Sequence, residues 1–304
     1  MRRTFRIATA ALSLWAGVAS TAAHAQSPPP PAPATLGSGS GKLLLTGGVS
    51  SIDGASGGGL TPWATTGSYA TEGEVGGTAF ATRAVTQKYA LTVFGAAVSF
   101  QDRAELSLAR QQFNASVVVP DTTLKLDVVG IKWRLAGEAV LDSDSLMPQI
   151  AVGAQFKHST PGPAVGGILD SVNAKRSGVD VYASATKLLL AQGVLLNATL
   201  RATKANQNGL LGFGSADKSG YSLQTEFSAA WLLRKDLAVG VEYRAKPDNL
   251  NFAGAAFHED DWKDLFVAWA PNKRLSLTAA YVDLGNIVGN ARQRGAYLSA
   301  QISF

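Results

Sequence analysis

Hydrophobic and polar residues alternate along most of the chain after residue 70. Between Tyr221 and Trp231, the odd positions are mostly apolar, whereas even positions such as Gln224 and Glu226 are polar up to residue 228. Similar stretches recur as far as the C-terminus. Because successive side chains of a β-strand point to opposite faces, each stretch predicts a strand with one apolar and one polar face.

About twelve such stretches follow one another, most of them roughly 9 to 13 residues long. They begin near Thr71, Tyr89, Ala104, Leu124, Met147, Val179, Val194, Gly220, Asp236, Lys263, Arg274 and Gly295. This length suits a strand that crosses a bilayer at a tilt, whereas strands of globular proteins average about five or six residues. The sequence therefore predicts an all-β fold, an antiparallel transmembrane β-barrel of about twelve strands over residues 71–304.

The connections between these strands alternate in length, as they do in outer-membrane barrels, where periplasmic turns are short and outer loops are long. Four of the five predicted periplasmic turns are short, and the exception runs from Gly137 to Leu146. The predicted outer connections are longer than these four: Phe113 to Thr123, His158 to Gly178, Ala205 to Ser219, Pro247 to Trp262 and Leu284 to Arg294. A secreted β-sandwich with its apolar face inward is the alternative, but it gives no reason for this sorting.

The first 25 residues have the parts of a secretory signal peptide. Arg2, Arg3 and Arg6 precede an apolar stretch from Ile7 to Ser20, and small residues end at an A-x-A site, Ala23 to Ala25. The apolar stretch is shorter than the ~20 residues of a membrane-spanning helix, which favours a cleaved signal over an N-terminal anchor. We therefore expect export to the cell outer membrane, with residues 26–40, rich in Pro, Gly and Ser, as a tether.

Composition removes several classes of function. The chain is 46% hydrophobic and 16% charged and has no cysteine. It therefore has no disulfide framework, thiolate nucleophile or Cys-ligated zinc site. Its formal charge of +5 includes the three arginines of the predicted signal peptide, so no nucleic-acid-binding surface is indicated.

Residues 41–70 do not continue the strand pattern. Leu43 to Val49 could form one more strand, but a thirteenth strand would make the number odd. The stretch that follows is rich in glycine, which permits close packing and positive φ angles. We expect residues 41–70 to form a plug in the lumen or a cover at the periplasmic mouth, with a poorly ordered linker as the alternative.

Few residues of the mature chain could support catalysis. Gly37 to Lys42 resembles a phosphate-binding loop, but Leu43 stands where that loop needs Ser or Thr. His158 with its neighbour Ser159 could be half of a lipid-hydrolysing site. His258 with the acidic run at 259–261 could resemble a protease site, but neither pair has a recognisable third member. The acidic run could also bind a divalent cation, although a solvated charge run is the simpler explanation, so the sequence indicates no catalytic residue, cofactor or metal site.

Charged residues on the polar faces of the strands are candidates to line the lumen. They are Glu105, Lys125, Asp127, Lys157, Arg201, Glu226, Glu242, Arg244 and Lys246. Because their signs are mixed, they either pair across the bore or leave a gap that sets solute preference. At the C-terminus, Leu298, Ile302 and Phe304 lie in step on the apolar face and resemble the assembly signal of outer-membrane barrels.

Several stretches carry a family resemblance: residues 41–48, 59–64, 205–214, 242–250 and 260–273. Through them the chain resembles the uncharacterised bacterial family called domain of unknown function 3034, over nearly all of the mature chain. The family has no assigned activity, so the resemblance implies an envelope protein and supplies no catalytic residues. It also implies that residues 41–64 are an ordered, functional part of the protein.

Together these features predict a porin-like integral outer-membrane protein that acts as a passive pore or a small-solute transporter, with uptake of an apolar substrate as one form. The competing hypothesis is a non-conducting structural or surface-interaction barrel, and a barrel lipid hydrolase or protease is third. The expected partners are outer-membrane lipid and lipopolysaccharide, the barrel-assembly machinery and an unknown small solute, and not nucleic acid.

Overall fold

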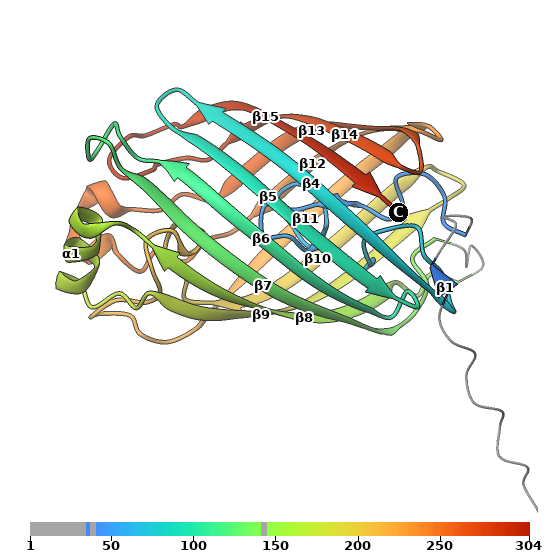
Figure 1. Ribbon diagram of the computed structural model, residues 1–304, viewed down its shortest axis with the longest axis horizontal. Helices are drawn as coiled ribbons and strands as arrows, with labels where there is room; N and C mark the ends of the chain where they lie inside the picture. Colours follow the sequence, from blue (N-terminus) through green and yellow to red (C-terminus); the bar gives the residue numbers. More distant parts are fainter. Residues whose placement is uncertain (1–34, 37–40, 141–144) are drawn as a thin grey trace, which may run out of the picture. The chain divides into compact units, whose positions relative to one another are not determined.

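The computed structural model describes residues 35–36, 41–140 and 145–304. The predicted signal peptide at 1–25 lies outside the described residues, as does most of the predicted tether at 26–40. In the described part of the chain, each of the strands β4 to β15 pairs antiparallel with the next, and β15 pairs with β4, so the sheet closes on itself (Figure 1). The predicted all-β barrel of twelve strands is therefore confirmed.

The barrel strands are β4 (Glu74–Thr86), β5 (Ala90–Phe100), β6 (Ala104–Asn114), β7 (Thr123–Ala136), β8 (Gln149–Thr160), β9 (Ser177–Leu189), β10 (Val194–Thr203), β11 (Ser222–Arg234), β12 (Leu237–Arg244), β13 (Trp262–Asn272), β14 (Leu275–Asp283) and β15 (Arg294–Ser303). A short strand, β1 (Thr35–Leu36), pairs in parallel with the start of β4. Each barrel strand begins within three residues of its predicted start, because alternation ends where the chain leaves the sheet.

The long connections gather at one end of the barrel, which we call the outer end, and most short ones lie at the other, the inner end (Figure 1). The outer connections carry α1 (Pro163–Ser171), η1 (Gln207–Gly209), η2 (Asn251–Ala253) and η3 (Ala255–Phe257). The longer inner connection, which was the exception in the sequence, follows Ala136 at the end of β7. No helix in the described ranges is long and apolar enough to cross a membrane.

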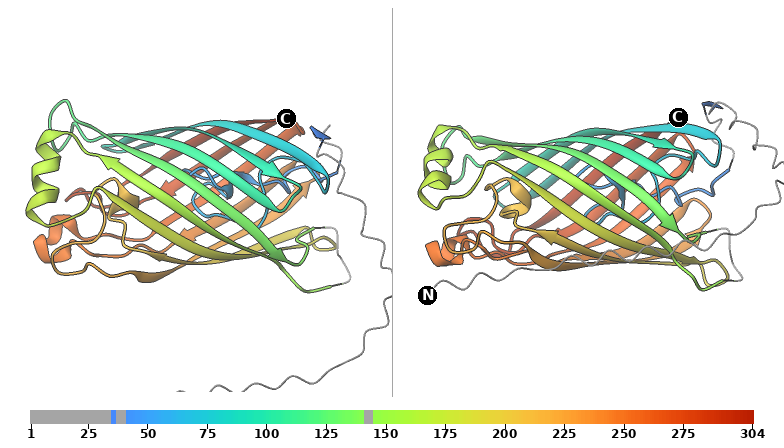
Figure 2. Two further views of the ribbon diagram at one scale, coloured as in Figure 1. Left: turned by 60° about the horizontal axis from the view of Figure 1, so that its bottom comes forward. Right: turned by 90° about the horizontal axis from the view of Figure 1, so that it is seen from below.

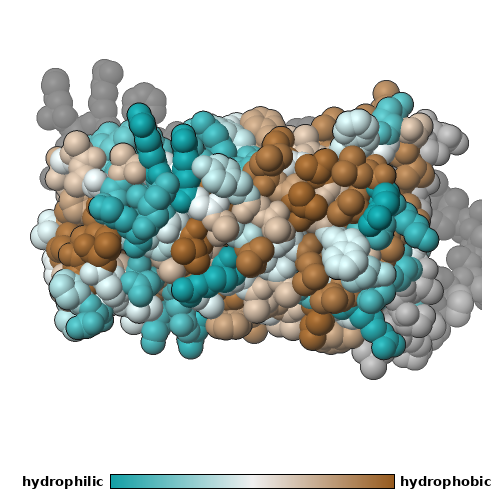
Figure 3. Space-filling view, turned by 90° about the horizontal axis from the view of Figure 1, so that it is seen from above, coloured by the Kyte–Doolittle hydropathy of each residue, from teal (hydrophilic) through white to brown (hydrophobic). Residues whose placement is uncertain are grey.

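The exterior of the wall changes from apolar to polar along its length. Strand register aligns two apolar outward rows: Ala96, Leu108, Val129 and Phe156, and next to it Val98, Leu106, Ile131 and Ala154. Nearer the outer end, two rows are mostly polar: Arg83, Thr92, Gln112 and Lys125, and Arg110, Asp127 and His158. Figure 3 shows the same change along one face of the molecule. An apolar band bordered by polar groups is typical of a barrel whose exterior faces hydrocarbon.

The interior is occupied by residues 46–70, which we call the lumenal segment. Every residue in this range is buried, and the segment includes a small antiparallel pair, β2 (Val49–Ser50) and β3 (Ser56–Gly57). Both views in Figure 2 show it inside the barrel wall. Its hydrogen bonds to inward side chains of the wall, such as that from Ser50 Oγ to Gln301 Oε1 at 2.8 Å, hold it there.

The assignment of the outward rows can be tested on one face of β6. Leu106 lies in an apolar row and Gln112 in a polar row of that face. We expect Leu106→Arg to impair barrel assembly, because a cation near the bilayer midplane costs roughly 2 to 4 kcal/mol. Gln112→Arg should assemble like the unaltered protein. Heat-modifiable mobility on gels gives the folded fraction, and equal fractions for the two variants would contradict the assignment.

Candidate functional site

Two wall carboxylates hold the backbone of the lumenal segment. Glu105 on β6 accepts hydrogen bonds from the backbone N–H of Ser56 at 3.0 Å and of Gly67 at 2.6 Å. Glu242 on β12 accepts from the N–H groups of Leu60 at 2.9 Å and Thr61 at 3.3 Å. Because a buried N–H without an acceptor is costly, these carboxylates stabilise the backbone of the segment where its own turns do not supply an acceptor.

Donors on the wall bind carbonyl groups of the same segment. Lys132 Nζ, on β7, donates to the carbonyls of Ser56 at 2.7 Å and Thr65 at 2.8 Å. Gln149 on β8 and Thr199 on β10 donate to neighbouring carbonyls of the segment, at 2.7 Å and 2.8 Å. The contacts come from strands around the circumference, so the segment is fastened to several sides of the barrel.

Six charged residues form a closed ring across the lumen, which we call the six-charge ring. Going round it, the members are Asp53, Lys157, Asp180, Arg201, Glu226 and Arg244, and each lies within ion-pair distance of the next. The separations run from 2.5 Å for Arg201 to Glu226 to 3.6 Å for Arg201 to Asp180. Five members belong to the wall, and Asp53 alone comes from the lumenal segment.

Asp53 is the only charged residue between positions 43 and 70. Its Oδ2 lies 2.9 Å from Arg244 Nη1 and 3.3 Å from Lys157 Nζ. Its Oδ1 accepts hydrogen bonds from the side-chain amides of Asn208 at 2.7 Å and Gln111 at 3.0 Å. Burial alone would raise the pKa of Asp53, but the charges of Lys157, Arg244 and Arg201 and the hydrogen bond from Asn208 together outweigh burial and hold this pKa well below its usual range. The carboxylate is therefore ionised in the folded protein.

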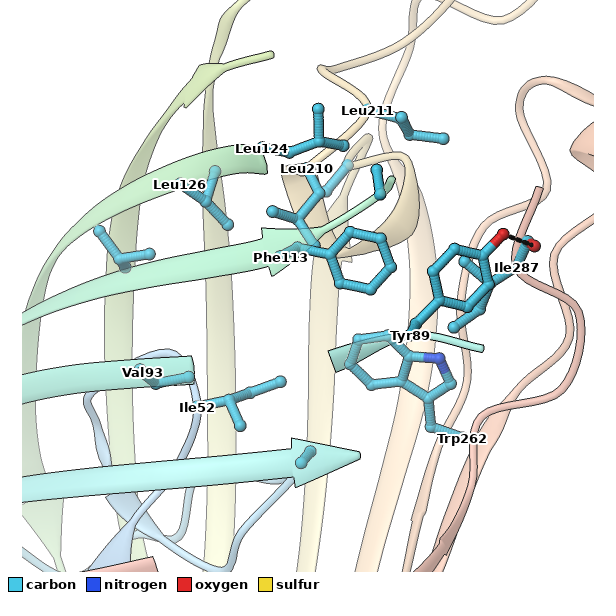
Figure 4. Packing of buried hydrophobic residues seen from close by; sticks show 14 of the residues in the cluster. Ile52, Tyr89, Val93, Phe113, Leu124, Leu126, Leu210, Leu211, Trp262 and Ile287 are labelled. Atoms are coloured by element: carbon cyan, nitrogen blue, oxygen red, sulfur yellow. Dashed lines mark hydrogen bonds between the residues drawn. The ribbon is translucent and has the colours of Figure 1, made fainter. Parts of the chain in front are cut away.

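A separate apolar pocket lies toward the outer end, beyond the six-charge ring. Its volume is about 140 Å³ and its surface is almost wholly apolar. Figure 4 shows the packing around it, with Tyr89 stacked on Phe113 at a ring-centroid distance of 5.1 Å and the Tyr89 hydroxyl donating to the Ile287 carbonyl at 2.9 Å. Trp262 forms another side, and Leu169 of α1 also lines the pocket. A cavity of about 150 Å³ with aliphatic and aromatic walls is large enough to hold benzene.

This apolar pocket, which we call the outer pocket, is lined by residues that also contact the lumenal segment or lie next to such residues. Gln111 lines the pocket and also donates its amide to the Ile52 carbonyl at 2.9 Å and to Asp53. Gln207 in η1 lines the pocket, and its neighbour Asn208 binds Asp53. Ile52 itself belongs to the same buried apolar cluster as Tyr89 (Figure 4). The pocket therefore lies directly outward of the point where Asp53 is held.

A second cavity, of about 300 Å³, lies at the inner end, and polar and charged residues make up most of its lining. Thr46 and Thr65 of the lumenal segment line it, together with residues of the inner turns. Asp102 in the first of these turns pairs with Lys42 at 2.6 Å and with Arg134 at 2.5 Å. The lumenal segment thus lies between an apolar cavity on the outer side and a cavity of mixed polarity on the inner side.

The structure places most of the candidate lumen residues inside the barrel. The buried, inward-directed members are Glu105, Lys157, Arg201, Glu226, Glu242, Arg244 and Lys246. Lys125 and Asp127 are a correction, because both side chains lie on the exterior, where Asp127 pairs with Arg110 at 2.6 Å. On β7 the inward positions at this level are Leu124 and Leu126, which belong to the apolar cluster of the outer end. Beyond the hydrocarbon band, polar side chains face outward and apolar ones inward, so polarity alone assigns the wrong face.

Sequence reasoning missed several buried charged residues of the lumen, among them Lys132, Asp180 and Asp53. Lys132 lies inward on β7 at the position opposite Glu105, with its Nζ 3.2 Å from a carboxylate oxygen. Strict alternation from the exterior residue Ile131 would have identified it. Asp180 and Asp53 complete the six-charge ring, and neither pairing is visible without the three-dimensional arrangement.

The histidines considered for catalysis have other contacts. His158 faces the exterior and its Nδ1 is 2.7 Å from Ser177 Oγ, whereas Ser159 faces inward and donates to the Leu210 carbonyl. Alternation along β8 thus puts the two on opposite faces. His258 is exposed, with Nδ1 2.6 Å from Asp248 Oδ2.

Each residue of the acidic run has its own partner. Glu259 accepts from the Gln207 N–H, Asp260 from the Asn286 N–H, and Asp261 from the Tyr243 hydroxyl. Over the described residues, no cluster of three or more His, Cys, Asp or Glu side chains could hold a metal ion. The proposed assembly residues Leu298, Ile302 and Phe304 all lie exposed at the end of the chain.

Comparison with known proteins gives a family and a set of barrels. The family described as "Protein of unknown function (DUF3034)" matches residues 46–301. No protein of curated function matches the chain. The chain resembles the KdgM porin in complex with disordered oligogalacturonate, at 10% identity over 75% of this chain and 99% of that chain, with a TM-score of 0.49. It also resembles the NanC porin, at 7% identity over 75% and 98% (TM-score 0.48), and outer membrane phospholipase A from Escherichia coli, at 9% identity over 75% and 92% (TM-score 0.41).

The six-charge ring makes a prediction about stability. Arg201→Met would leave Glu226 and Asp180 buried with one cation fewer between them, so the free energy of unfolding should fall by about 3 to 5 kcal/mol. Arg110→Met breaks the pair with Asp127 on the exterior, where solvent screens the charges, and should change stability little. Urea unfolding of both variants in lipid vesicles measures the difference, and similar values would show that the ring is not a buried network.

A second prediction concerns pH. Both carboxylate oxygens of Glu259 accept the Gln207 N–H at 2.9 Å, and Lys246 Nζ lies 3.4 Å away. Burial raises the pKa of Glu259 to about 7, and Lys246 offsets only part of this effect. Because the folded-state pKa is raised, this group's contribution to stability is complete below the ordinary value of 4.5 and is lost as pH rises through about 7.

Amide exchange at Gln207 between about pH 5 and pH 8 measures this effect once the intrinsic exchange rate is divided out. Protection should fall across the range in the unaltered protein and stay constant in Glu259→Gln. An equal fall in both proteins would assign the pH dependence to another group.

Proposed function

The chain belongs to the DUF3034 family, whose description assigns no function, and we propose that it is an outer-membrane barrel for uptake of a small apolar solute. In this proposal the solute enters through the outer pocket, and the lumenal segment is the plug that closes the lumen. The observation that carries the proposal is the position of an apolar pocket directly outward of a lumen filled by residues 46–70.

Three features support a location in the outer membrane. The sheet closes on itself, which leaves no unpaired strand edge in hydrocarbon. The exterior carries an apolar band bordered by polar rows. The first 25 residues have the pattern of an export signal. The outward polar rows, with Arg83, Arg110 and Lys125, would then meet the anionic groups of lipopolysaccharide at the membrane surface.

The contents of the lumen argue against an always-open pore for ions. The inward charges of the six-charge ring pair with one another, and Glu105 and Glu242 are engaged by the lumenal segment. Passage therefore requires the segment to move. A solute in the outer pocket would contact Gln111, which binds Asp53, and Gln207, whose neighbour Asn208 binds Asp53. Solute binding could therefore weaken the contacts that hold the segment in place.

A non-conducting structural barrel is the second candidate. The same filled lumen favours it, since a barrel packed across its whole width needs no passage to be stable. The two candidates differ in whether the lumenal segment moves out of the lumen during the protein's function.

A reversible cross-link separates these candidates. The chain has no natural cysteine, and the hydroxyls of Thr61 in the segment and Ser228 on β11 are in hydrogen-bond contact. A Thr61→Cys, Ser228→Cys double variant should lose uptake of radiolabelled benzoate, a small aromatic solute, into cells when oxidised and regain it when reduced. The matched control is Thr82→Cys with Ser299→Cys, two wall residues whose hydroxyls are 2.8 Å apart, which should transport in both states.

If the oxidised Thr61→Cys, Ser228→Cys variant takes up the solute as fast as the natural protein, the segment is not a plug that moves. If cells that express the natural protein take up benzoate no faster than cells without it, the structural barrel is favoured.

A further inference from the structure

We propose that the position taken by the Asp53 carboxylate is a binding site for the carboxylate of a small apolar acid, whose hydrocarbon body occupies the outer pocket. This inference rests on the proposed uptake function and names the class of solute. In it, Asp53 occupies the site when no solute is bound, and the incoming acid replaces it.

The groups around Asp53 are those that recognise a carboxylate. Arg244 and Lys157 supply positive charge at 2.9 Å and 3.3 Å from Oδ2, and the amides of Asn208 and Gln111 donate hydrogen bonds to Oδ1. Two cations and two neutral donors around a buried anion form a strong, charge-assisted site. Lys157, Arg244, Asn208 and Gln111 lie outside the lumenal segment, so they stay in place if that segment withdraws.

The charges of the wall require an anion at this position. The wall contributes three cations to the six-charge ring, Lys157, Arg201 and Arg244, but only two carboxylates, Asp180 and Glu226. Withdrawal of Asp53 would leave one buried positive charge without a partner, which is strongly unfavourable. A neutral solute cannot remove that penalty, whereas a carboxylate can. An acid therefore exchanges with Asp53, and an uncharged hydrocarbon does not.

The Asp53 carboxylate does not use all the donors around it, so another carboxylate could bind there more tightly. Although two cations lie near Oδ2, this oxygen makes no hydrogen bond with any described residue. Asp53 is attached to a backbone that is held at many other points, so its carboxylate cannot turn freely toward the donors. A free acid has no such restriction and can orient both oxygens.

The outer pocket is adjacent to this position through shared residues. Gln111 contacts both, and the pocket residue Gln207 precedes Asn208. Ile52, the residue before Asp53, packs in the apolar cluster that surrounds the pocket (Figure 4). The pair Ile52 and Asp53 thus places an apolar group toward the outer end and a carboxylate in the ring, the same arrangement that an apolar acid would have.

The test compares benzoate with benzyl alcohol, which have nearly the same shape and differ in charge. Calorimetric titration of the purified full chain in detergent measures the affinity for each. Asp53→Asn removes the competing carboxylate, so benzoate should bind about tenfold more tightly or better, while the affinity for benzyl alcohol stays the same. The matched control is Asp127→Asn, which makes the same change from carboxylate to amide on the exterior of β7, away from the lumenal segment. It should not increase benzoate affinity.

Two further measurements keep the test decisive if Asp53→Asn folds poorly. Benzoate should raise the unfolding temperature of this variant, because it returns an anion to the ring, and benzyl alcohol should not. Adding Arg244→Gln to Asp53→Asn should abolish the gain in benzoate affinity. A gain that persists in this double variant would place benzoate elsewhere and overturn the proposal.

The proposed function and this inference fail in different ways. If Asp53→Asn and Asp127→Asn give equal benzoate affinities, the carboxylate site is wrong, whereas benzyl alcohol binding in the pocket still supports apolar uptake. Ala115→Phe fills the pocket and should abolish binding of both compounds, and Ala96→Phe, on the exterior, should not. If neither compound binds to any of the proteins, the pocket itself is not a solute site and the proposed function fails.

Discussion

Pairing of buried charge is the constraint on which the interior of this barrel depends. The inward faces of β8, β9, β10, β11 and β12 bring lysine, arginine and carboxylate side chains into a space almost without solvent. Charges in such a place are tolerated when they are paired with an opposite charge or held by several hydrogen bonds. The wall alone does not balance at the level of the six-charge ring, and Asp53 of the lumenal segment completes it. The position of that segment thus follows from charge as well as from the space available.

The outward and inward faces of the wall exchange polarity along the length of the barrel. In the apolar band, hydrophobic side chains face outward and polar ones face the lumenal segment. Toward the outer end, Arg110 and Lys125 face outward while Leu124, Leu126 and Phe113 face inward. This exchange follows from the surroundings, because beyond the hydrocarbon layer the exterior meets water and headgroups. The same exchange produces the outer pocket. The inward hydrophobic residues at this level pack against apolar residues of the outer connections and leave the pocket between them.

The fold was predictable because the alternation of apolar and polar residues can be recognised within the sequence of each single strand. The strand number, the strand starts and the sorting of long and short connections all follow from it, and the longer connection after β7 was recognised as an exception. The lumen was less predictable. Charge alone predicts that Lys125 and Asp127 face inward, whereas alternation along β7 from the exterior residue Ile131 places both outward. Asp53 and Asp180 are far apart in sequence, and their common partner Lys157 follows only from the closed arrangement of strands.

Glycine explains how wall carboxylates reach the backbone of the lumenal segment. A Cβ atom on Gly58 would lie 2.0 Å from Oε1 of Glu242, so any larger residue would push the carboxylate away from the N–H groups of Leu60 and Thr61. The segment is therefore held largely through its backbone, and few of its side chains take part. This explains why so many of its residues are small and uncharged.

The lumenal segment is also continuous with the wall, since its last residue, Ala70, is followed within a few residues by Glu74 at the start of β4. The segment is therefore tethered to the wall. If it leaves the lumen as proposed, this short link keeps it at a high effective concentration near the contacts it has left, so its return requires no second protein.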